Sequence, residues 1–144
     1  MCGIAGIFSQ KPVASELYDS IVHLQHRGQD AAGIMTYDER MHKEKGMGLA
    51  KEIFNKENLH LLSGNIGISH NRYPTHGGFS HGEVQPFWTS VPYGIALSHN
   101  GNLTNYKELA KEVTKEETRY LNTTSDSEVL LHLFADHLHQ NIPP

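Results

Sequence analysis

Residues 2–8 of the chain read Cys-Gly-Ile-Ala-Gly-Ile-Phe, directly behind Met1. The aliphatic side chains and glycines of this run predict a buried strand, which would hold the residue at its start rigidly. That residue, Cys2, is the only cysteine of the chain. Removal of Met1 would leave a thiol and a free α-amine on it, and α-amines titrate near about pH 8. Two interpretations are open: a buried structural thiol, or a nucleophile whose own amine is the base.

Composition and charge narrow the class of protein. The 144 residues can form one domain with a hydrophobic core, and an apolar fraction of 38% indicates a globular chain. The 12 basic residues form no cluster, so no nucleic-acid partner is expected. Because the sequence has neither an apolar run of about 18 residues nor a signal-peptide pattern, no membrane association is expected. A single cysteine fits a reducing compartment, and we expect a cytoplasmic protein.

Hydrophobic periodicity predicts the remaining elements outward from residues 2–8. Strands are expected at residues 31–37, 41–45, 65–71 and 93–98, and helices at residues 15–25, 51–55, 105–113 and 125–139. Residues 73–90 are expected to be irregular. A capping box is expected at residues 125–128, and the buried stripe of the last helix at Leu130, Leu133, Phe134, His137 and Leu138. Hairpin-linked strands with helices late in the chain predict a single α+β domain with antiparallel sheets.

Four polar clusters lie at predicted strand ends or helix starts, where catalytic groups collect on a rigid scaffold. They are centred on Arg27, Arg72, Asn100-Gly101 and Asp126. Each has a structural alternative. Arg27 could pair with Asp30, and Arg72 could be a surface charge at a strand end. Asn100-Gly101 could simply form a turn, and the Asp126 carboxylate could simply stabilise the helix dipole. Together with the thiol, they could attack a carboxamide on an amino acid. The set offers a nucleophile, oxyanion donors, a guanidinium for an α-carboxylate and a carboxylate for an α-ammonium.

The eleven histidines raise a metal site as a competing hypothesis. The nearest groupings are His23 with His26, His76 with His81, and a set of three in the last predicted helix. None has the HExxH spacing of metalloproteases or an accompanying cysteine pair, so no metal is predicted. The sequence also lacks a P-loop and a dinucleotide-binding fingerprint.

Six motifs occur in a fixed order, namely Cys2-Gly3-Ile4, residues 25–33, Arg72-Tyr73-Pro74-Thr75, Gln85-Pro86-Phe87, residues 99–103 and residues 124–128. This order resembles the glutaminase domain of the class II (N-terminal nucleophile) glutamine amidotransferases, from Cys2 to about Leu138. Within the class, the motifs are most similar to those of the amidophosphoribosyltransferases. The resemblance therefore covers nearly the whole chain.

The resemblance implies a fold, an activity and residue roles. The fold would be the N-terminal nucleophile hydrolase sandwich, with four α/β/β/α layers and antiparallel sheets. Cys2 would hydrolyse the glutamine side-chain amide through a thioester, supplying ammonia for phosphoribosylamine formation in de novo purine biosynthesis. Asn100 and Gly101 would hold the oxyanion, and Arg27 would orient the nucleophile. Glutamine would be bound by Arg72, Thr75, His76 and Asp126.

The family's glutaminase domain is longer than this chain. The resemblance therefore implies that residues 1–144 are a partial domain, incomplete at its C-terminal end, and that a synthase domain is missing. No cofactor is expected here, and Mg²⁺ would be expected only in that missing domain. The parent enzyme would be a homo-oligomer that uses L-glutamine.

Two alternatives to this assignment stay open. One is the glutaminase domain of glucosamine-6-phosphate synthase or of another class II amidotransferase, which the segment Thr75-His76-Gly77 favours. The other is a catalytically idle fragment that acts as an interaction module.

Overall fold

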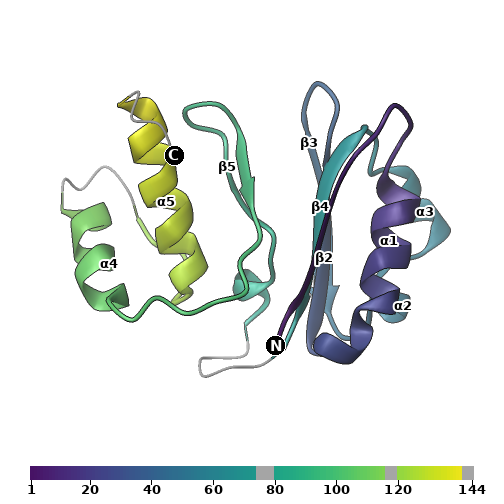
Figure 1. Cartoon of the computed structure of the whole chain (residues 1–144), viewed down its shortest axis with the longest axis horizontal. Coiled ribbons are helices and arrows are strands. Elements are labelled where there is room, and N and C mark those ends of the chain that lie inside the picture. Colours follow the sequence, from purple (N-terminus) through teal and green to yellow (C-terminus); the bar gives the residue numbers. More distant parts are fainter. Residues whose placement is uncertain (74–79, 116–119, 141–144) are drawn as a thin grey trace.

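The computed structural model describes residues 1–73, 80–115 and 120–140. Its elements stack in four layers, seen edge-on in Figure 1. Helices α1 (Ala14–His23), α2 (Ala50–Ile53) and α3 (Lys56–His60) cover one face of a four-stranded sheet. A two-stranded sheet lies on the other side, with α4 (Tyr106–Thr114) and α5 (Asp126–His139) beyond it. The predicted α+β class and the α/β/β/α sandwich of antiparallel sheets are confirmed.

The four-stranded sheet sets the position of the N-terminus. Its strands are, in spatial order, β1 (Gly3–Phe8), β4 (Ile66–Arg72), β2 (Ala31–Tyr37) and β3 (Met41–Met47). Every neighbouring pair is antiparallel, with Gly3 opposite Asn71 and Ala31 opposite Arg72. The start of β1, the end of β4 and the start of β2 therefore lie at the same end of the sheet. Cys2 lies at this end, one residue ahead of β1.

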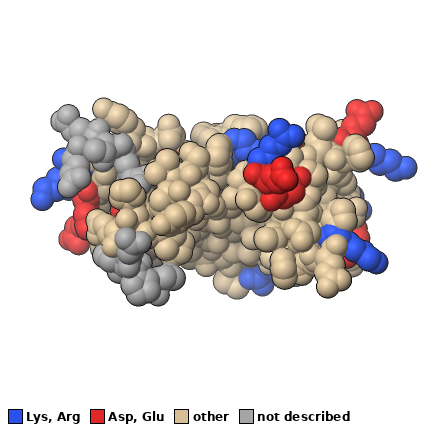
Figure 2. All heavy atoms as spheres, turned by 90° about the horizontal axis from the view of Figure 1, so that it is seen from above, with Lys and Arg blue, Asp and Glu red and all other residues tan. Residues whose placement is uncertain are grey.

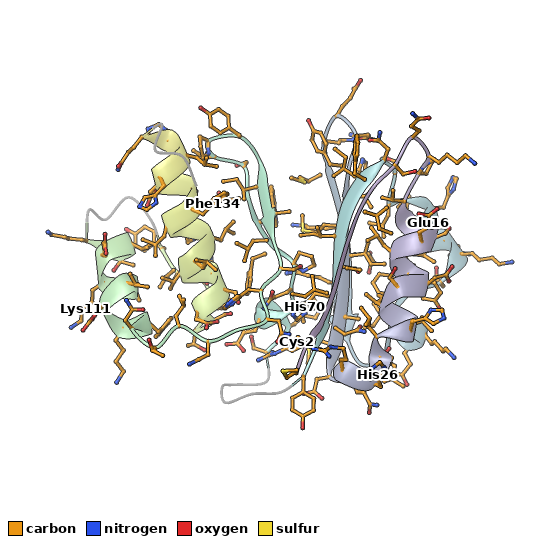
Figure 3. The ribbon with its side chains drawn as sticks, in the orientation of Figure 1. Cys2, Glu16, His26, His70, Lys111 and Phe134 are labelled. Carbon is orange, nitrogen blue, oxygen red and sulfur yellow. The ribbon has the colours of Figure 1, made fainter. Side chains whose placement is uncertain are left out.

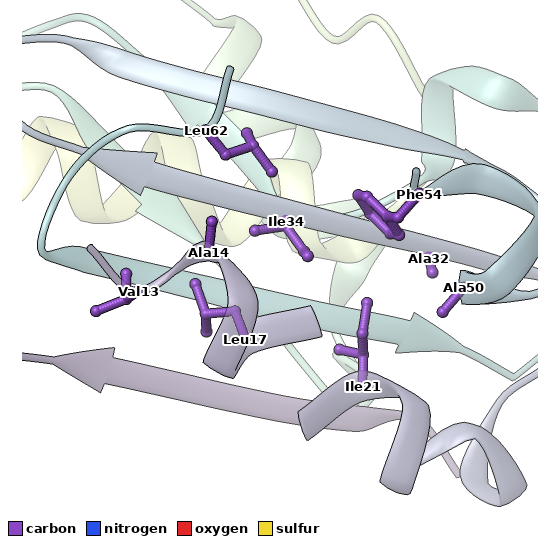
Figure 4. Close-up of a cluster of buried hydrophobic side chains, with 9 residues drawn as sticks. All are labelled: Val13, Ala14, Leu17, Ile21, Ala32, Ile34, Ala50, Phe54 and Leu62. Carbon is purple, nitrogen blue, oxygen red and sulfur yellow. The ribbon is translucent and has the colours of Figure 1, made fainter. Parts of the chain in front are cut away.

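The main hydrophobic core lies between this sheet and the helices that cover it (Figure 4). Leu17 and Ile21 of α1 are fully buried there. Ile34 projects into the core from β2, and the Tyr18 and Phe54 rings pack edge-to-face with centroids 6.1 Å apart. Because a fully buried Leu or Ile contributes about 1.5–3 kcal/mol, this cluster anchors the helices to the sheet.

The second sheet is small, and two lysine side chains of the first sheet contact it or the segment before it. It consists of β5 (Phe87–Thr89) and β6 (Ile95–Leu97), which are antiparallel, and α5 packs on both strands. Lys45 of β3 reaches across and donates to the Val84 carbonyl at 2.6 Å, and burial lowers the pKa of Lys45. The Lys43 ammonium lies 4.4 Å from the centre of the Trp88 ring.

Charged side chains of both signs are scattered over the surface seen in Figure 2. The face in Figure 2 shows isolated basic and acidic side chains in a largely uncharged surface. No helix within the described ranges is long and apolar enough to cross a membrane.

Four predictions about local structure are wrong. β5 and the short 3-10 helix η2 (His81–Glu83) lie inside the stretch expected to be irregular, and α3 was not expected. The capping box is absent, because Ser125 accepts from the Ser127 amide while the Glu128 carboxylate accepts from Asn122 and Thr123. In α5 the buried apolar residues are Val129, Leu131 and Ala135, whereas the residues of the predicted stripe are only partly buried and His137 is exposed. The helix is sandwiched between the second sheet and α4, so a single-sided periodicity does not apply.

Gly33 of β2 packs directly against the loop that precedes β5. The backbone carbonyl of Gln85 lies so close that a β-carbon at position 33 would collide with backbone atoms. We expect Gly33→Ala to lower the free energy of unfolding by at least about 2 kcal/mol, because this loop must move away from the first sheet to admit the methyl group. Gly6→Ala is the matched control, since its β-carbon would meet Ile68 at an ordinary 3.7 Å. Urea unfolding measures both, and equal losses would contradict this account.

His70 of β4 is fully buried between the sheets (Figure 3). Burial, helped by the nearby charges of Arg72 and His99, lowers the pKa of its imidazole to about 4. The native state therefore resists protonation of His70, whereas the unfolded chain takes up a proton below about pH 6.5.

The stability of the protein should accordingly fall as the pH drops from about 6.5 towards 4. For this histidine alone, the loss in unfolding free energy between pH 7 and pH 5 is about 2 kcal/mol. His70→Leu should flatten the pH dependence by this amount, whereas His60→Leu, at an exposed position, should keep the wild-type slope. Urea unfolding at a series of pH values tests this, and parallel curves for the wild type and His70→Leu would refute it.

Candidate active site

A cavity of about 680 Å³ lies at the end of the sheet where the N-terminus is located. Met1 and Cys2 line it from the N-terminus, and Arg72 lines it from the end of β4. Asn100 contributes from the segment after β6, and Asp126 from the first turn of α5. Residues from the first sheet, from the segments that flank the second sheet and from one outer helix layer therefore share one pocket, although they are far apart in the sequence.

The main chain of Cys2 is held by two side chains. Its N–H donates to Asn100 Oδ1 at 3.2 Å, and its carbonyl accepts from Asn100 Nδ2 at 3.2 Å. Arg27 Nε donates to the same carbonyl at 3.0 Å, in place of the ion pair with Asp30 that was considered for it. The pairing of one amide with both backbone groups fixes the orientation of Cys2 as well as its position.

The thiol of Cys2 faces the pocket. The residue is partly exposed, and Figure 3 shows it at the end of the gap between the layers. The Tyr73 amide donates towards Sγ at 3.5 Å. The alternative of a fully buried structural thiol is therefore wrong. The Cys2 nitrogen carries Met1, whose side chain is 72% exposed.

Arg27 reaches Cys2 because η1 (Gln25–Arg27) packs closely against the end of β4. A side chain at Gly28 would collide with the backbone of Arg72, so only glycine permits this approach. The Gln25 side chain stabilises the turn by donating to the Gly28 carbonyl at 2.6 Å and accepting from the Ala50 amide at 2.8 Å.

The alternative that Arg72 is merely a surface charge at a strand end is wrong. Its Nη2 lies 2.8 Å from Glu83 Oε2, and the two side chains are only 17% and 7% exposed. The other carboxylate oxygen of Glu83 accepts from Thr124 Oγ1 at 2.7 Å. Nη1 of Arg72 is buried and has no hydrogen-bond partner among the described residues. The guanidinium is thus fixed by one nitrogen and keeps a second for a ligand.

Asp126 joins the start of α5 to the segment that follows Gly101. Its Oδ2 accepts from the Leu103 amide at 2.8 Å, and its Oδ1 lies 3.9 Å from His99 Nδ1. The carboxylate is placed in the first turn of a 14-residue helix, where the helix dipole favours negative charge. Gly101 lines the same pocket.

The structure thus brings together six of the eight residues predicted for the site: Cys2, Arg27, Arg72, Asn100, Gly101 and Asp126. Thr75 and His76 lie outside the described residues. Glu83, Gln85 and His99 also line the pocket, and none of them was predicted as a site residue. Glu83 could have been singled out, because it is the only acidic residue in the irregular stretch 73–90.

The competing metal hypothesis finds no support in the geometry. Within the described ranges, no three His, Cys, Asp or Glu side chains are grouped closely enough to hold a metal ion. The arrangement instead offers a partly exposed thiol, amide groups beside it, and a cation and an anion on the walls of the cavity.

Comparisons with known proteins agree with this geometry. Residues 70–143, just over half of the chain, match the family model described as "Glutamine amidotransferase domain". The chain is 51% identical over 139 residues to an amidophosphoribosyltransferase of Pseudomonas aeruginosa, covering 96% of this chain and 28% of that protein. It is 51% identical over 140 residues to the Escherichia coli amidophosphoribosyltransferase, with the same coverage of both chains. The chain therefore spans less than a third of the length of these curated relatives.

A solved structure shows the same fold. The glutamine phosphoribosylpyrophosphate amidotransferase of B. subtilis, complexed with ADP and GMP, superimposes with a TM-score of 0.80 at 36% identity. The superposition covers 92% of this chain and 29% of that one. From the matched family model, together with the pocket built around Cys2, we conclude that the chain belongs to the glutamine amidotransferase domain family.

Proposed function

We propose that this chain is the partial glutaminase domain of an amidophosphoribosyltransferase. In this proposal, it hydrolyses the side-chain amide of L-glutamine through Cys2, and the ammonia serves a synthase domain that forms phosphoribosylamine in purine biosynthesis. The observation that carries the proposal is the double contact of Asn100 with the backbone of Cys2 at a pocket walled by Arg72 and Asp126. The similar proteins are amidophosphoribosyltransferases, which supports a phosphoribosyl group as the acceptor of the ammonia.

The chemistry begins once Met1 has been removed. The Cys2 amine takes the thiol proton, and the sulfur forms a bond to the amide carbon while the carbonyl electron pair moves onto oxygen. The Gly101 N–H and Asn100 Nδ2 stabilise this oxyanion. Nδ2 has two hydrogens, of which one is used by the Cys2 carbonyl, so that the other is available. The amine then protonates the departing nitrogen, ammonia leaves, and water hydrolyses the thioester to glutamate.

The two charges on the pocket walls suit the two ends of glutamine. The unpartnered Nη1 of Arg72 can bind the α-carboxylate while Nη2 remains with Glu83. Asp126 can bind the α-ammonium. Thr75 and His76 are proposed as further pocket residues on the strength of the resemblance alone.

The setting of the domain is part of the same proposal. The relatives are more than three times as long as this chain, which supports a synthase domain elsewhere in the parent protein. A homo-oligomeric assembly of that parent is proposed on the strength of the resemblance alone. A cytoplasmic location is supported by the single cysteine, which fits a reducing compartment.

Cys2→Ala should abolish ammonia release from glutamine, because the variant keeps the α-amine and loses the nucleophile. We expect a loss of at least about 1,000-fold in kcat, measured by a coupled ammonia assay. Mass analysis of the N-terminus of both proteins is the control, since the mechanism requires Cys2 to be the first residue. Ammonia release that survives the substitution would show that Cys2 is not the nucleophile.

Arg72→Ala and Asp126→Ala should act chiefly on glutamine binding. Each removes a charge-assisted hydrogen bond of about 1.5–3 kcal/mol to one end of the substrate, so KM should rise roughly 10- to 100-fold with a smaller change in kcat. Arg40→Ala and Asp19→Ala, at exposed positions, are the matched controls. Steady-state kinetics with glutamine separates the two parameters, and an unchanged KM in both pocket variants would place the substrate elsewhere.

A further inference from the structure

The motif Gln85-Pro86-Phe87 has no part in the chemistry described so far. Gln85 lies between η2 and β5, with only 8% of its surface exposed. We propose that Gln85 is a positioning residue for the oxyanion-stabilising group, because its side-chain amide fixes the backbone from which Asn100 projects. This inference rests on the proposed glutaminase function.

The contact between Gln85 and His99 is two-sided. Gln85 Oε1 accepts from the His99 N–H at 2.7 Å, and Gln85 Nε2 donates to the His99 carbonyl at 3.2 Å. β6 ends at Leu97, so His99 has already left the ladder with β5. A planar amide offers one donor and one acceptor side by side, as a neighbouring strand would. Gln85 thus replaces the missing strand partner of the residue that precedes Asn100.

A third hydrogen bond closes the arrangement. The Gln85 Nε2 group also donates to Ser127 Oγ at 3.1 Å, and Ser127 Oγ lies 3.2 Å from His99 Nδ1. Ser127 is in the first turn of α5 and is almost fully buried. The loop before β5, the segment after β6 and the start of α5 are therefore joined at Gln85, and both of its N–H groups are used.

Gln85 is itself held in place by its surroundings. Its backbone carbonyl packs against Gly33 of the first sheet, and Pro86, the next residue, is fully buried. Because Gln85 is anchored against the first sheet, its hydrogen bonds hold the His99 backbone at a fixed position relative to that sheet. The neighbouring Asn100 then repeats the same two-sided contact on Cys2, so that two amide side chains link the buried interface to the nucleophile.

This role predicts a particular kinetic effect. Gln85 touches the segment that carries the oxyanion donors, whereas the ends of glutamine are bound by Arg72 and Asp126. Misplacing Asn100 weakens an interaction made in the transition state and leaves ground-state binding intact. Substitution of Gln85 should therefore lower kcat and leave KM for glutamine nearly constant.

The test is steady-state ammonia release from glutamine by the folded protein. We expect Gln85→Ala to lower kcat roughly 10- to 100-fold, with KM changed by less than about 2-fold. Asn58→Ala is the matched control, because the Asn58 amide also bonds two backbone groups, the Asn55 N–H and the Ile53 carbonyl, in the helix layer far from the pocket. It should keep the wild-type kcat. A wild-type kcat in Gln85→Ala, or a rise in KM alone, would overturn the inference.

Gln85→Glu provides a second variant of nearly the same shape. Its ionised carboxylate can accept from the His99 N–H but repels the His99 carbonyl, whereas the protonated form can donate to that carbonyl. The kcat of Gln85→Glu relative to the wild type should therefore rise as the pH is lowered from 8 to 6. A ratio that is constant with pH would count against the two-sided contact.

Amide hydrogen exchange tests the contact without turnover. The His99 N–H should exchange at least about 10-fold faster in Gln85→Ala than in the wild type and Asn58→Ala, because its acceptor is gone. Unchanged exchange overturns the inference. If the wild-type protein releases no ammonia, the proposed function is wrong and the catalytic role of Gln85 falls with it. If the wild type is active and Gln85→Ala is equally active, the inference alone is wrong.

Discussion

The antiparallel register between β1 and β4 places Gly3 opposite Asn71, and the remaining contacts of the site follow from it. Among the described strands β1 lies at the edge of the sheet and pairs with β4 alone. A shift of one residue would turn every side chain of β1 to the opposite face. With this register, Cys2 lies beside the end of β4 and within reach of Arg27 and Asn100. The position of the thiol is therefore set by main-chain pairing along a whole strand.

Near the pocket, buried polar side chains form a polar layer. Two connected groups make up this layer: Arg72 with Glu83 and Thr124, and Gln85 with His99 and Ser127. Buried polar groups are costly unless they are paired, and in a medium of low dielectric their contacts are also stronger. These hydrogen bonds consequently fix the orientation of the polar side chains. A ligand that bonds to Arg72 Nη1 would satisfy a buried donor that has no other partner in the described structure.

Much of the first sheet could be predicted because its signals are local. The strands at residues 31–37 and 65–71 have clear apolar runs with turn residues at their ends, and the structure matches them closely. β5 could not be predicted in this way, since three residues carry no period and the strand exists only through its pairing with β6 and its packing on α5. The capping box failed for a different, local reason: the N–H groups of Asn122 and Thr123, just ahead of α5, bond the Glu128 carboxylate in place of the Ser125 N–H.

The site shows the same division between local and long-range information. Six of its residues were predicted, although their convergence depends on strand register and on the close approach at Gly28, which spacing along the sequence does not encode. Glu83 and Gln85 were overlooked because neither acts on its own. Each acquires a role only through the residue that it contacts, Arg72 or His99, and these contacts join residues that are 11 and 14 positions apart in the sequence.

Cys2 makes its main-chain contacts with Asn100 and Arg27 while its nitrogen is still bonded to Met1. These contacts therefore form with Met1 still in place. In the proposed mechanism, cleavage of the Met1–Cys2 bond would turn one nitrogen from a neutral amide into a basic amine. The Cys2 carbonyl could keep its bonds to Asn100 and Arg27, so this maturation step would change the chemistry of one atom within contacts that are already formed.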